Sequence, residues 1–283
     1  MFAMEYLDRR RSLVDERLSA VVADLEPDLL RSEVGHTVLS GGKRVRPTMT
    51  IIVCEAVGGT PEAAVDFGVG VELVHNASLV VDDIIDDSAV RRGAESAWSA
   101  FGYGPAIVSS DAHLGEAFAL FSRDPRAMQI VAEAMVELGE GEAIELVAQP
   151  ENEAEYMELA RRKTGALFRA AAEVGAVAAD ADAHTVEAVG EYAERVGIAF
   201  QIRDDVLDAT ADAEDLGKPT GQDAEMERPS LLQVTDLSPE EANGRAQAES
   251  ETALSALSRV EPANTQAYEY LRDLAEFVVV RER

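Results

Sequence analysis

The sequence predicts an all-α protein, and three observations lead to this expectation. Apolar residues recur with the 3.6-residue period of amphipathic helices, and no convincing alternating pattern typical of strands is present. Helix-start signals also recur, in which a capping residue precedes a proline at the first helical position, as in Thr60-Pro61 and Asp124-Pro125. A third such signal, Ser238-Pro239, continues into a capping box with Glu241. We therefore expect a bundle of about ten or more helices.

The expected helices cover most of the chain. They span residues 4–24, 27–39, 47–57, 61–86, 104–121, 125–148, 153–178, 183–209, 239–259 and 263–281. The longest stretches that we expect to be irregular are 87–103 and 210–228. Because no repeat, linker or low-complexity segment divides the 283 residues, we expect one domain over residues 1–283.

The composition argues against several classes of protein. The chain carries 54 acidic residues against 25 lysines and arginines, which gives a formal net charge of −29. A surface of this charge repels nucleic acid and anionic lipid, so we expect no nucleic-acid partner and no stable membrane insertion. The single cysteine, Cys54, and the lack of an apolar N-terminal segment predict a cytoplasmic protein. The even spread of acids along the chain indicates a halophilic protein, in which salt screens the self-repulsion.

Two clusters of aspartates lie within helices that are otherwise apolar. Each has the pattern DDxxD, with Asp82, Asp83 and Asp86 in the first cluster and Asp204, Asp205 and Asp208 in the second. Aspartates four residues apart share one side of a helix. Mg²⁺ usually combines one or two carboxylates with the oxygens of substrate phosphates. Two such helices facing each other across a bundle would hold magnesium and a diphosphate between them.

Basic residues are grouped around the aspartates. Only three of the 25 basic residues are lysines, namely Lys43, Lys163 and Lys218. Lys43 lies in the segment GGKRVRP, where the glycines let the backbone approach a ligand and the following helix N-terminus favours an anion. Arg91 and Arg92 follow the first aspartate cluster, in reach of phosphate oxygens. Together these cations predict a diphosphate-binding site.

The motifs resemble those of the trans-isoprenyl diphosphate synthase family. The matching elements, in the order of the family, are GGKRVRP at 41–47, ELVHNASLVVDDIIDDSAVRRG at 72–93, RKTGALF at 162–168, GIAFQIRDDVLD at 197–208 and LGKPTGQD at 216–223. The resemblance implies a helical bundle of the isoprenoid synthase type with a central cavity. It also implies a prenyltransferase that joins isopentenyl diphosphate head-to-tail to an allylic diphosphate, with roughly three magnesium ions per active site.

The resemblance also implies a role for individual residues. Isopentenyl diphosphate would be held by Lys43, Arg46, His75 and Arg92. The six aspartates would organise the magnesium ions on the allylic diphosphate, which would itself contact Arg91, Lys163 and Lys218. The catalytic residues at the reacting centre would be Lys163, Thr164, Gln201 and Lys218.

The length of the product depends on the floor of the pocket that holds the growing chain. Ala77 and Ser78 precede the first aspartate cluster by five and four positions, and both are small. Members of the family that stop at fifteen carbons have bulky aromatic residues at these places. The resemblance therefore implies a longer product, with the twenty-carbon geranylgeranyl diphosphate as the prediction. The alternative is a floor supplied by another helix, for example by Phe118.

Some positions depart from the family's pattern. Val81 replaces the usual histidine before the first cluster, Glu142 replaces a glutamine, Ser110 replaces a glycine, and Arg228 replaces a lysine. Because none of these changes removes a metal ligand, we expect an active enzyme, which would form a homodimer as the family usually does. One alternative is a non-catalytic or weakly active regulatory subunit of a heteromeric synthase. A class I terpene cyclase is a third hypothesis, although it would not need GGKRVRP.

Overall fold

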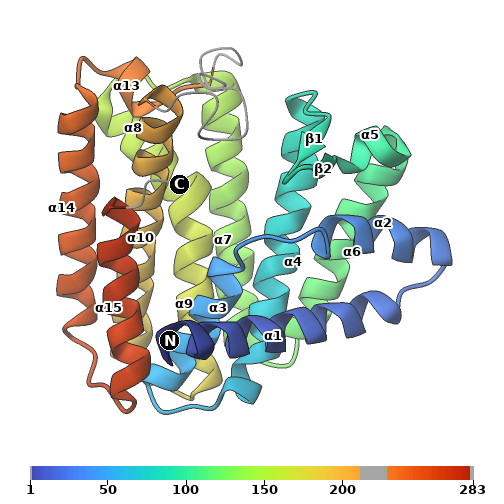
Figure 1. Ribbon diagram of the computed structural model, residues 1–283, viewed down its shortest axis with the longest axis horizontal. Coiled ribbons are helices and arrows are strands. Elements are labelled where there is room, and N and C mark those ends of the chain that lie inside the picture. The colour runs from blue at the N-terminus through green and yellow to red at the C-terminus, as the bar shows by residue number, and fades with distance from the viewer. Residues whose placement is uncertain (1, 211–227, 281–283) are drawn as a thin grey trace.

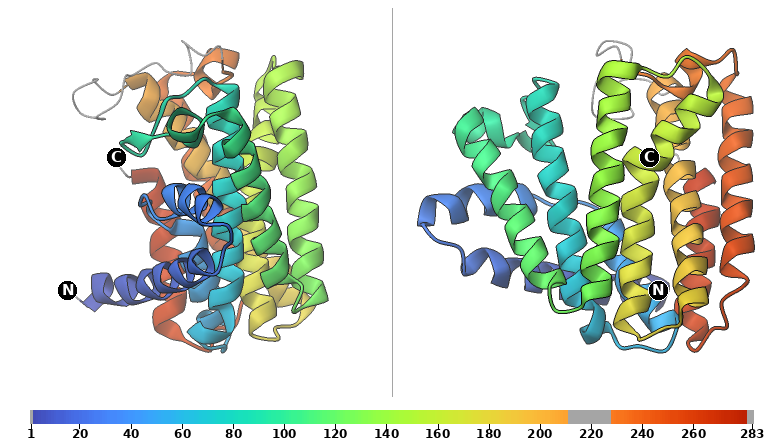
Figure 2. Two further views of the ribbon diagram at one scale, coloured as in Figure 1. Left: turned by 90° about the vertical axis from the view of Figure 1, so that its right-hand side faces the viewer. Right: turned by 180° about the vertical axis from the view of Figure 1, so that it is seen from behind.

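The computed structural model describes residues 2–210 and 228–280, and this part of the chain is almost entirely helical (Figure 1). Most of the long helices run side by side, and α1 and α2 cross them on one face of the bundle (Figure 2). The predicted all-α fold is therefore confirmed. The helices in chain order are α1 (Phe2–Ala23), α2 (Asp28–Val38), α3 (Val45–Ala56), α4 (Pro61–Ile85), α5 (Ala97–Phe101), α6 (Tyr103–Phe121), α7 (Pro125–Ala143), α8 (Glu153–Ala160), α9 (Ala166–Ala178), α10 (Ala183–Thr210), α13 (Leu231–Val234), α14 (Pro239–Leu257) and α15 (Thr265–Val280).

Two irregularities interrupt helices that the sequence predicts to be continuous. The π-helical turn η1 (Ile144–Ala148) follows α7, and the π-helical turn η2 (Arg161–Gly165) joins α8 to α9. Periodicity does not reveal such turns, because one extra residue in a single turn hardly changes the apolar pattern around it. Both turns prove to lie beside the candidate active site.

The stretch 87–103 is more regular than the sequence predicts. It contains a short antiparallel hairpin of β1 (Val90–Arg91) and β2 (Ala94–Glu95), followed by α5. Strands of two residues are too short to show an alternating pattern, so the expectation of an irregular segment was wrong here. Most of the other stretch expected to be irregular, 210–228, lies outside the described residues.

The predicted helix starts are present at α7 and α14. The side chain of Asp124 accepts a hydrogen bond from the backbone N–H of Arg126 at 2.8 Å. At α14, Ser238 accepts from the N–H of Glu241, and the Glu241 carboxylate accepts from the N–H of Ser238 at 2.8 Å. Such caps satisfy backbone donors that have no partner within the helix, which is why the sequence located these boundaries well.

The central helix α4 has few polar side chains outside its C-terminal end. By length and composition it is the one helix among the described residues that could cross a membrane, but 67% of its most apolar window is buried inside the bundle. Its packing against α6 is close, because a Cβ atom added at Gly70 would lie 2.6 Å from the ring of Phe121. These are properties of a core helix, and they fix the position of the aspartates at its end.

His113 on α6 is a fully buried histidine with both ring nitrogens engaged. Its Nδ1 lies 2.5 Å from the carbonyl oxygen of Ser109, and its Nε2 lies 2.8 Å from Oγ1 of Thr37 on α2. Because a carbonyl oxygen only accepts, Nδ1 carries a proton. Burial lowers the pKa of His113 to about 4. The histidine is thus a core residue and not a ligand-binding residue.

The buried neutral His113 predicts a loss of stability at mildly acidic pH. In the unfolded chain the imidazole takes up a proton below a pH of roughly 6.5, whereas in the folded protein it stays neutral to about 4. His113 therefore contributes its full share to the free energy of unfolding above the pKa that it has in the unfolded chain. This contribution is lost as the pH falls towards the pKa of the folded protein. Between pH 7 and pH 5, the free energy of unfolding should fall by about 2 kcal/mol more in the wild type than in His113→Asn. Denaturant titrations at both pH values measure this difference, and equal pH dependence in the two proteins would contradict it.

Candidate active site

A cavity of about 540 Å³ lies between α3, α4, α7, η2 and α10, and it collects most of the candidate residues. The candidates that line it are Lys43, Arg46, His75, Ser78, Asp82, Arg91, Arg92, Lys163, Thr164, Gln201 and Asp204. The first of these candidates in the chain, Lys43, and the last, Asp204, are 161 positions apart. The structure therefore brings at least one member of each predicted motif in the described residues to one place.

Other candidates do not line this cavity. They are Ala77, Asp83, Asp86, Asp205 and Asp208. Lys218 lies outside the described residues. The two aspartate clusters thus contribute one side chain each to the cavity wall, Asp82 from α4 and Asp204 from α10.

One end of the cavity is cationic. The guanidinium of Arg46 donates to Nε2 of His75 at 3.3 Å and stacks on the ring of Phe168, 4.4 Å from its centroid. Burial lowers the pKa of His75 well below its usual value, and the neighbouring arginines Arg46 and Arg92 add to this effect. The imidazole is therefore neutral. The Nε atom of Arg46 is buried without a hydrogen-bond partner in the structure.

Arg44 behaves differently from its neighbours in GGKRVRP. It adopts a left-handed backbone conformation with a φ of 52° and is only 5% exposed. Its guanidinium donates to Asp15 on α1 at 2.9 Å, to Glu72 on α4 at 2.7 Å and to the carbonyl oxygen of Val38 at 2.5 Å. This role could not be predicted from the sequence, because adjacent cations carry no local signal of which one turns inward.

The other end of the cavity is rich in carboxylates. Lys163 forms ion pairs with Glu142, at 3.2 Å, and with Glu145. Burial and, to a smaller extent, the charge of Glu142 raise the pKa of Asp82 to about 7, against the opposing charges of Lys163, Arg228 and Arg91. Burial disfavours the charged form of Lys163, but the charges of Glu145, Glu142 and Asp82 outweigh it and raise the pKa. Carboxylates therefore outnumber cations at this end.

The remaining aspartates of the first cluster are held by arginines. Asp83, which is 3% exposed, accepts from Nε of Arg91 at 2.8 Å and from a second nitrogen of that guanidinium at 2.5 Å. Asp86 forms an ion pair with Arg228. These contacts join the first cluster to the hairpin that carries Arg91 and to the segment after the second cluster.

In the second cluster, Asp205 is a buried structural link. It accepts from the hydroxyl of Tyr156 on α8 at 2.6 Å and from the N–H of Leu231 in α13 at 2.8 Å. Its other oxygen accepts from Nε2 of Gln201 at 3.0 Å. Oε1 of Gln201 in turn accepts from the hydroxyl of Thr164 at 2.7 Å, so Asp205 orients the two polar side chains predicted at the reacting centre.

The π-helical turn η2 carries Lys163 and Thr164 into the cavity. Helix α7 passes very close to this turn, because a Cβ atom added at Gly141 would lie 2.8 Å from the backbone nitrogen of Lys163. Only glycine allows this approach. The crossing places Glu142, the residue after Gly141, beside the Lys163 ammonium group.

The donor set fits magnesium in the presence of a diphosphate. Within residues 2–210 and 228–280, no three acidic, histidine or cysteine side chains converge to form a metal cage. Mg²⁺ does not require such a cage, because it commonly binds through one or two carboxylates, phosphate oxygens and water. Asp82 and Asp204 supply carboxylates on the wall of one cavity, and the cationic end provides for the diphosphate charge.

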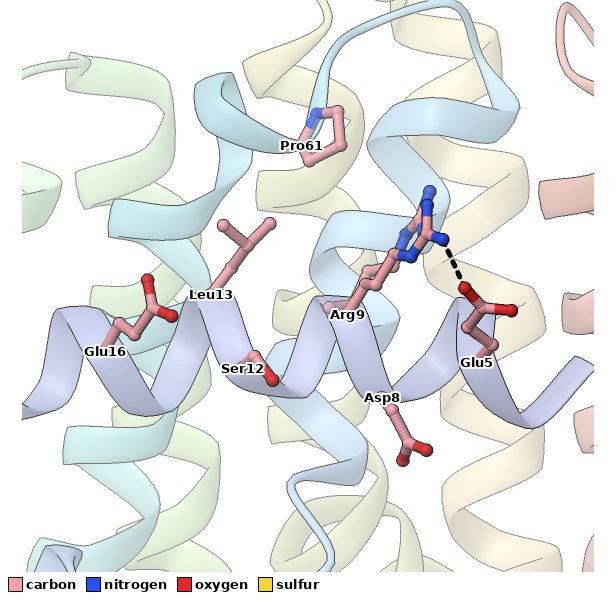
Figure 3. A pocket seen from close by; sticks show the side chains of 8 residues that line it. Glu5, Asp8, Arg9, Ser12, Leu13, Glu16 and Pro61 are labelled. Atoms are coloured by element: carbon pink, nitrogen blue, oxygen red, sulfur yellow. Dashed lines mark hydrogen bonds and ion pairs between the residues drawn. The ribbon is translucent and has the colours of Figure 1, made fainter.

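A second hollow, of about 810 Å³, runs along the outer face of α1 (Figure 3). It is lined by surface side chains of this helix, including the ion pair between Glu5 and Arg9, and by Pro61. None of the candidate residues lies there. The smaller cavity is therefore the candidate active site.

Over most of its length the chain is similar to known proteins of one family. The family model described as polyprenyl synthetase matches residues 27–271. The short chain isoprenyl diphosphate synthase of Methanothermobacter thermautotrophicus is 34% identical over 246 residues, 84% of this chain and 76% of that protein. The octaprenyl diphosphate synthase of Escherichia coli is 33% identical over 220 residues, 75% of this chain and 68% of that protein. The crystal structure of geranylgeranyl pyrophosphate synthetase from Pyrococcus horikoshii superposes with a TM-score of 0.90 and 32% identity, covering 99% and 98% of the two chains.

The fold and the site together define a trans-prenyltransferase of the isoprenoid synthase type. The chain belongs to the polyprenyl synthetase family. The resemblance that the motifs predict is therefore confirmed at the level of family, fold and class of enzyme.

The close crossing at Gly141 predicts a sharp difference between two glycines of α7. Gly141→Ala should lower the free energy of unfolding by roughly 1–3 kcal/mol and reduce prenyl transfer, because the added methyl group displaces Lys163. At Gly139 nothing lies within 4 Å of the added Cβ, so Gly139→Ala should leave the rate unchanged and stabilise the helix slightly. Thermal unfolding and initial rates measure both effects. Equal behaviour of the two variants would show that the crossing is not tight.

Proposed function

We propose that the protein is a geranylgeranyl diphosphate synthase, which adds isopentenyl diphosphate to an allylic diphosphate until the product has twenty carbons. The observation that carries this proposal is one cavity whose wall combines a group of cations, a group of carboxylates and apolar side chains. The apolar wall includes Leu138, Leu167, Phe168 and Phe200. The structural neighbour from Pyrococcus horikoshii, which is named for this product, supports the proposal.

The cationic end is the proposed site of isopentenyl diphosphate. Lys43, Arg46 and Arg92 supply positive charge there. Neutral His75 accepts from Arg46 and so fixes the direction of its guanidinium. Several convergent guanidinium groups bind diphosphate oxygens strongly, because such hydrogen bonds are charge-assisted.

The carboxylate end is the proposed site of the allylic diphosphate. Asp82 and Asp204 would hold the metal ions, and Lys163 and Arg91 would contact the diphosphate directly. Lys218 is proposed for the same contact by analogy with the family. Bound magnesium would stabilise the charge of the diphosphate as a leaving group, and we propose three ions at each site on the same analogy. Asp83 orients Arg91, and Asp205 orients Gln201. Asp86 and Asp208 are the remaining members of the two predicted aspartate clusters.

The reaction follows from this arrangement of charges. The C–O bond of the allylic diphosphate breaks, and the bonding electron pair leaves with the diphosphate. The double bond of isopentenyl diphosphate then supplies the electron pair of the new C–C bond, and a proton is lost to the diphosphate. Thr164 and Gln201 present oriented oxygen dipoles to the developing cation, and electrostatic preorganisation of this kind is usually the largest catalytic contribution.

The structure separates the two small residues proposed to leave room for the chain. Ser78 lines the cavity, whereas Ala77 is 3% exposed and its carbonyl oxygen accepts from Ser110 on α6. We therefore place the growing chain beside Ser78. Relatives of similar identity are named as a short chain isoprenyl diphosphate synthase and as an octaprenyl diphosphate synthase. Their names therefore do not decide the length of the product, and the proposed length rests on the space beside Ser78.

A homodimer and a cytoplasmic location remain part of the proposal. Exposed apolar side chains gather on the neighbouring helices α4 and α6, which favours a second copy of the chain as their cover. They are Val81, Ile85, Tyr103, Ile107 and Val108, each at least 41% exposed. Light scattering of the purified protein in solution tests the assembly directly.

Product analysis tests the proposed reaction. The purified protein, with magnesium and labelled isopentenyl diphosphate, should extend dimethylallyl, geranyl and farnesyl diphosphates to a twenty-carbon product. Ser78→Phe should shorten the main product by one or more five-carbon units, because the ring fills the space beside α4. The control Ser255→Phe changes the same residue type on α14, away from the cavity, and should leave product length unchanged.

The outcomes separate the hypotheses. A fifteen-carbon product from the wild type would keep the reaction and overturn the length assignment. The absence of incorporation with every primer, in folded protein, would instead favour the non-catalytic regulatory subunit.

A further inference from the structure

Glu72 is a buried carboxylate at the cationic end of the cavity, and the reaction described above gives it no role. It lies on α4, is 2% exposed and borders the cavity together with Arg44, Arg46 and Arg92. A negative charge in a pocket for diphosphate opposes the ligand directly. The contacts of Glu72 with the neighbouring side chains show what offsets this repulsion of the diphosphate.

The first contact of Glu72 is with Arg44. Oε1 of Glu72 accepts from Arg44 at 2.7 Å, and both side chains are buried. The other nitrogens of Arg44 reach Asp15 on α1 and the carbonyl oxygen of Val38 at the end of α2. Arg44 lies between Lys43 and Arg46 in a left-handed turn, so its three contacts connect this turn to α1, α2 and α4.

The second contact of Glu72 leads to Arg92. Nδ2 of Asn76 donates to the Glu72 carbonyl oxygen at 2.7 Å and to Oε1 of the same residue at 3.2 Å. This orientation turns Oδ1 of Asn76 towards Arg92, which donates to it at 3.4 Å and to the carbonyl oxygen of Gly41 at 2.9 Å. A Cβ atom at Gly42 would lie 3.0 Å from the guanidinium carbon of Arg92, so the guanidinium lies flat against the glycine turn.

Glu72 is also the carboxylate that offsets repulsion among these arginines. Burial lowers the pKa of Arg46 to about 10, the charge of Arg92 adds to this effect, and Glu72 opposes it. Burial likewise lowers the pKa of Arg92, again with Glu72 as the largest opposing charge. Without Glu72, the three guanidinium groups would repel one another in the absence of an anion.

We propose that Glu72, together with Asn76, is a positioning residue for isopentenyl diphosphate, which holds Arg44 and Arg92 in the arrangement that receives the diphosphate. The inference rests on the proposed function, because it assumes that this end of the cavity binds isopentenyl diphosphate. The predicted effect of Glu72 on anion binding is opposite to the effect of its charge alone. Neutralising Glu72 removes a negative charge from an anion site and yet weakens binding of the anion.

The test combines direct binding with kinetics. Calorimetric titration with isopentenyl diphosphate, without magnesium, isolates the cationic end of the site. Glu72→Gln should weaken this binding about tenfold, and it should raise the KM for isopentenyl diphosphate by a similar factor. The KM for the allylic diphosphate should stay within about twofold, because Glu72 does not contact the carboxylate end.

Two further variants keep the test decisive. Glu173→Gln removes another buried glutamate, paired with Arg169 on α9 at 2.8 Å, and should change neither KM. Asn76→Ala removes only the link to Arg92 and should weaken binding in the same direction as Glu72→Gln, by a smaller factor. It provides the test if Glu72→Gln does not fold, which circular dichroism establishes.

The outcomes distinguish this inference from the proposed function. If the wild type turns over but both variants bind isopentenyl diphosphate as tightly as it does, or more tightly, the positioning role is wrong and the function stands. A parallel rise of both KM values, in Glu72→Gln and in Glu173→Gln, would assign Glu72 to fold stability alone. If the wild type neither binds nor transfers isopentenyl groups, the proposed function fails and the inference falls with it.

Discussion

Like charges lie close together at both ends of one cavity, and the surrounding bundle holds them there. Arg44, Arg46 and Arg92 repel one another at one end, and Asp82 and Glu142 do so at the other. Groups arranged in this way stay charged only with compensation from within the protein or from a ligand. Glu72 and Lys163 supply part of it. The remaining need for opposite charge is the property that the proposed function uses, in which a diphosphate and a divalent cation would bind together.

The arrangement depends on packing that brings distant segments unusually close. Gly141 lets α7 approach the π-helical turn that carries Lys163, and Gly70 lets α4 meet the ring of Phe121. Asp205 ties α8, α10 and α13 to one point and at the same time orients Gln201. Residues that stabilise the bundle and residues that shape the site are therefore partly the same, so substitutions at these places should affect both properties.

Helix boundaries and most of the site could be predicted from the sequence, because their signals are local or belong to motifs. Caps such as Asp124 and Ser238 mark where helices begin, and the DDxxD and GGKRVRP segments supply many of the residues that line the candidate cavity. The turning of Arg44 into the protein, away from the direction of Lys43, could not be predicted. It depends on the left-handed turn and on Asp15 and Glu72, which are distant in sequence. The pairing of Asp83 with Arg91 and the π-helical turns likewise arise from tertiary contacts.

In the proposed mechanism Asp82 and Asp204 recruit a divalent cation for diphosphate, and thermal unfolding with inorganic diphosphate measures this step. In the wild type, adding magnesium to the diphosphate should raise the Tm by several degrees beyond the effect of diphosphate alone, since a ligand that binds the folded state stabilises it. The double variant Asp82→Asn, Asp204→Asn should lose this increment, while the exposed-surface control Asp111→Asn keeps it. If magnesium still raises the Tm of the double variant beyond the effect of diphosphate alone, Asp82 and Asp204 do not hold the cation.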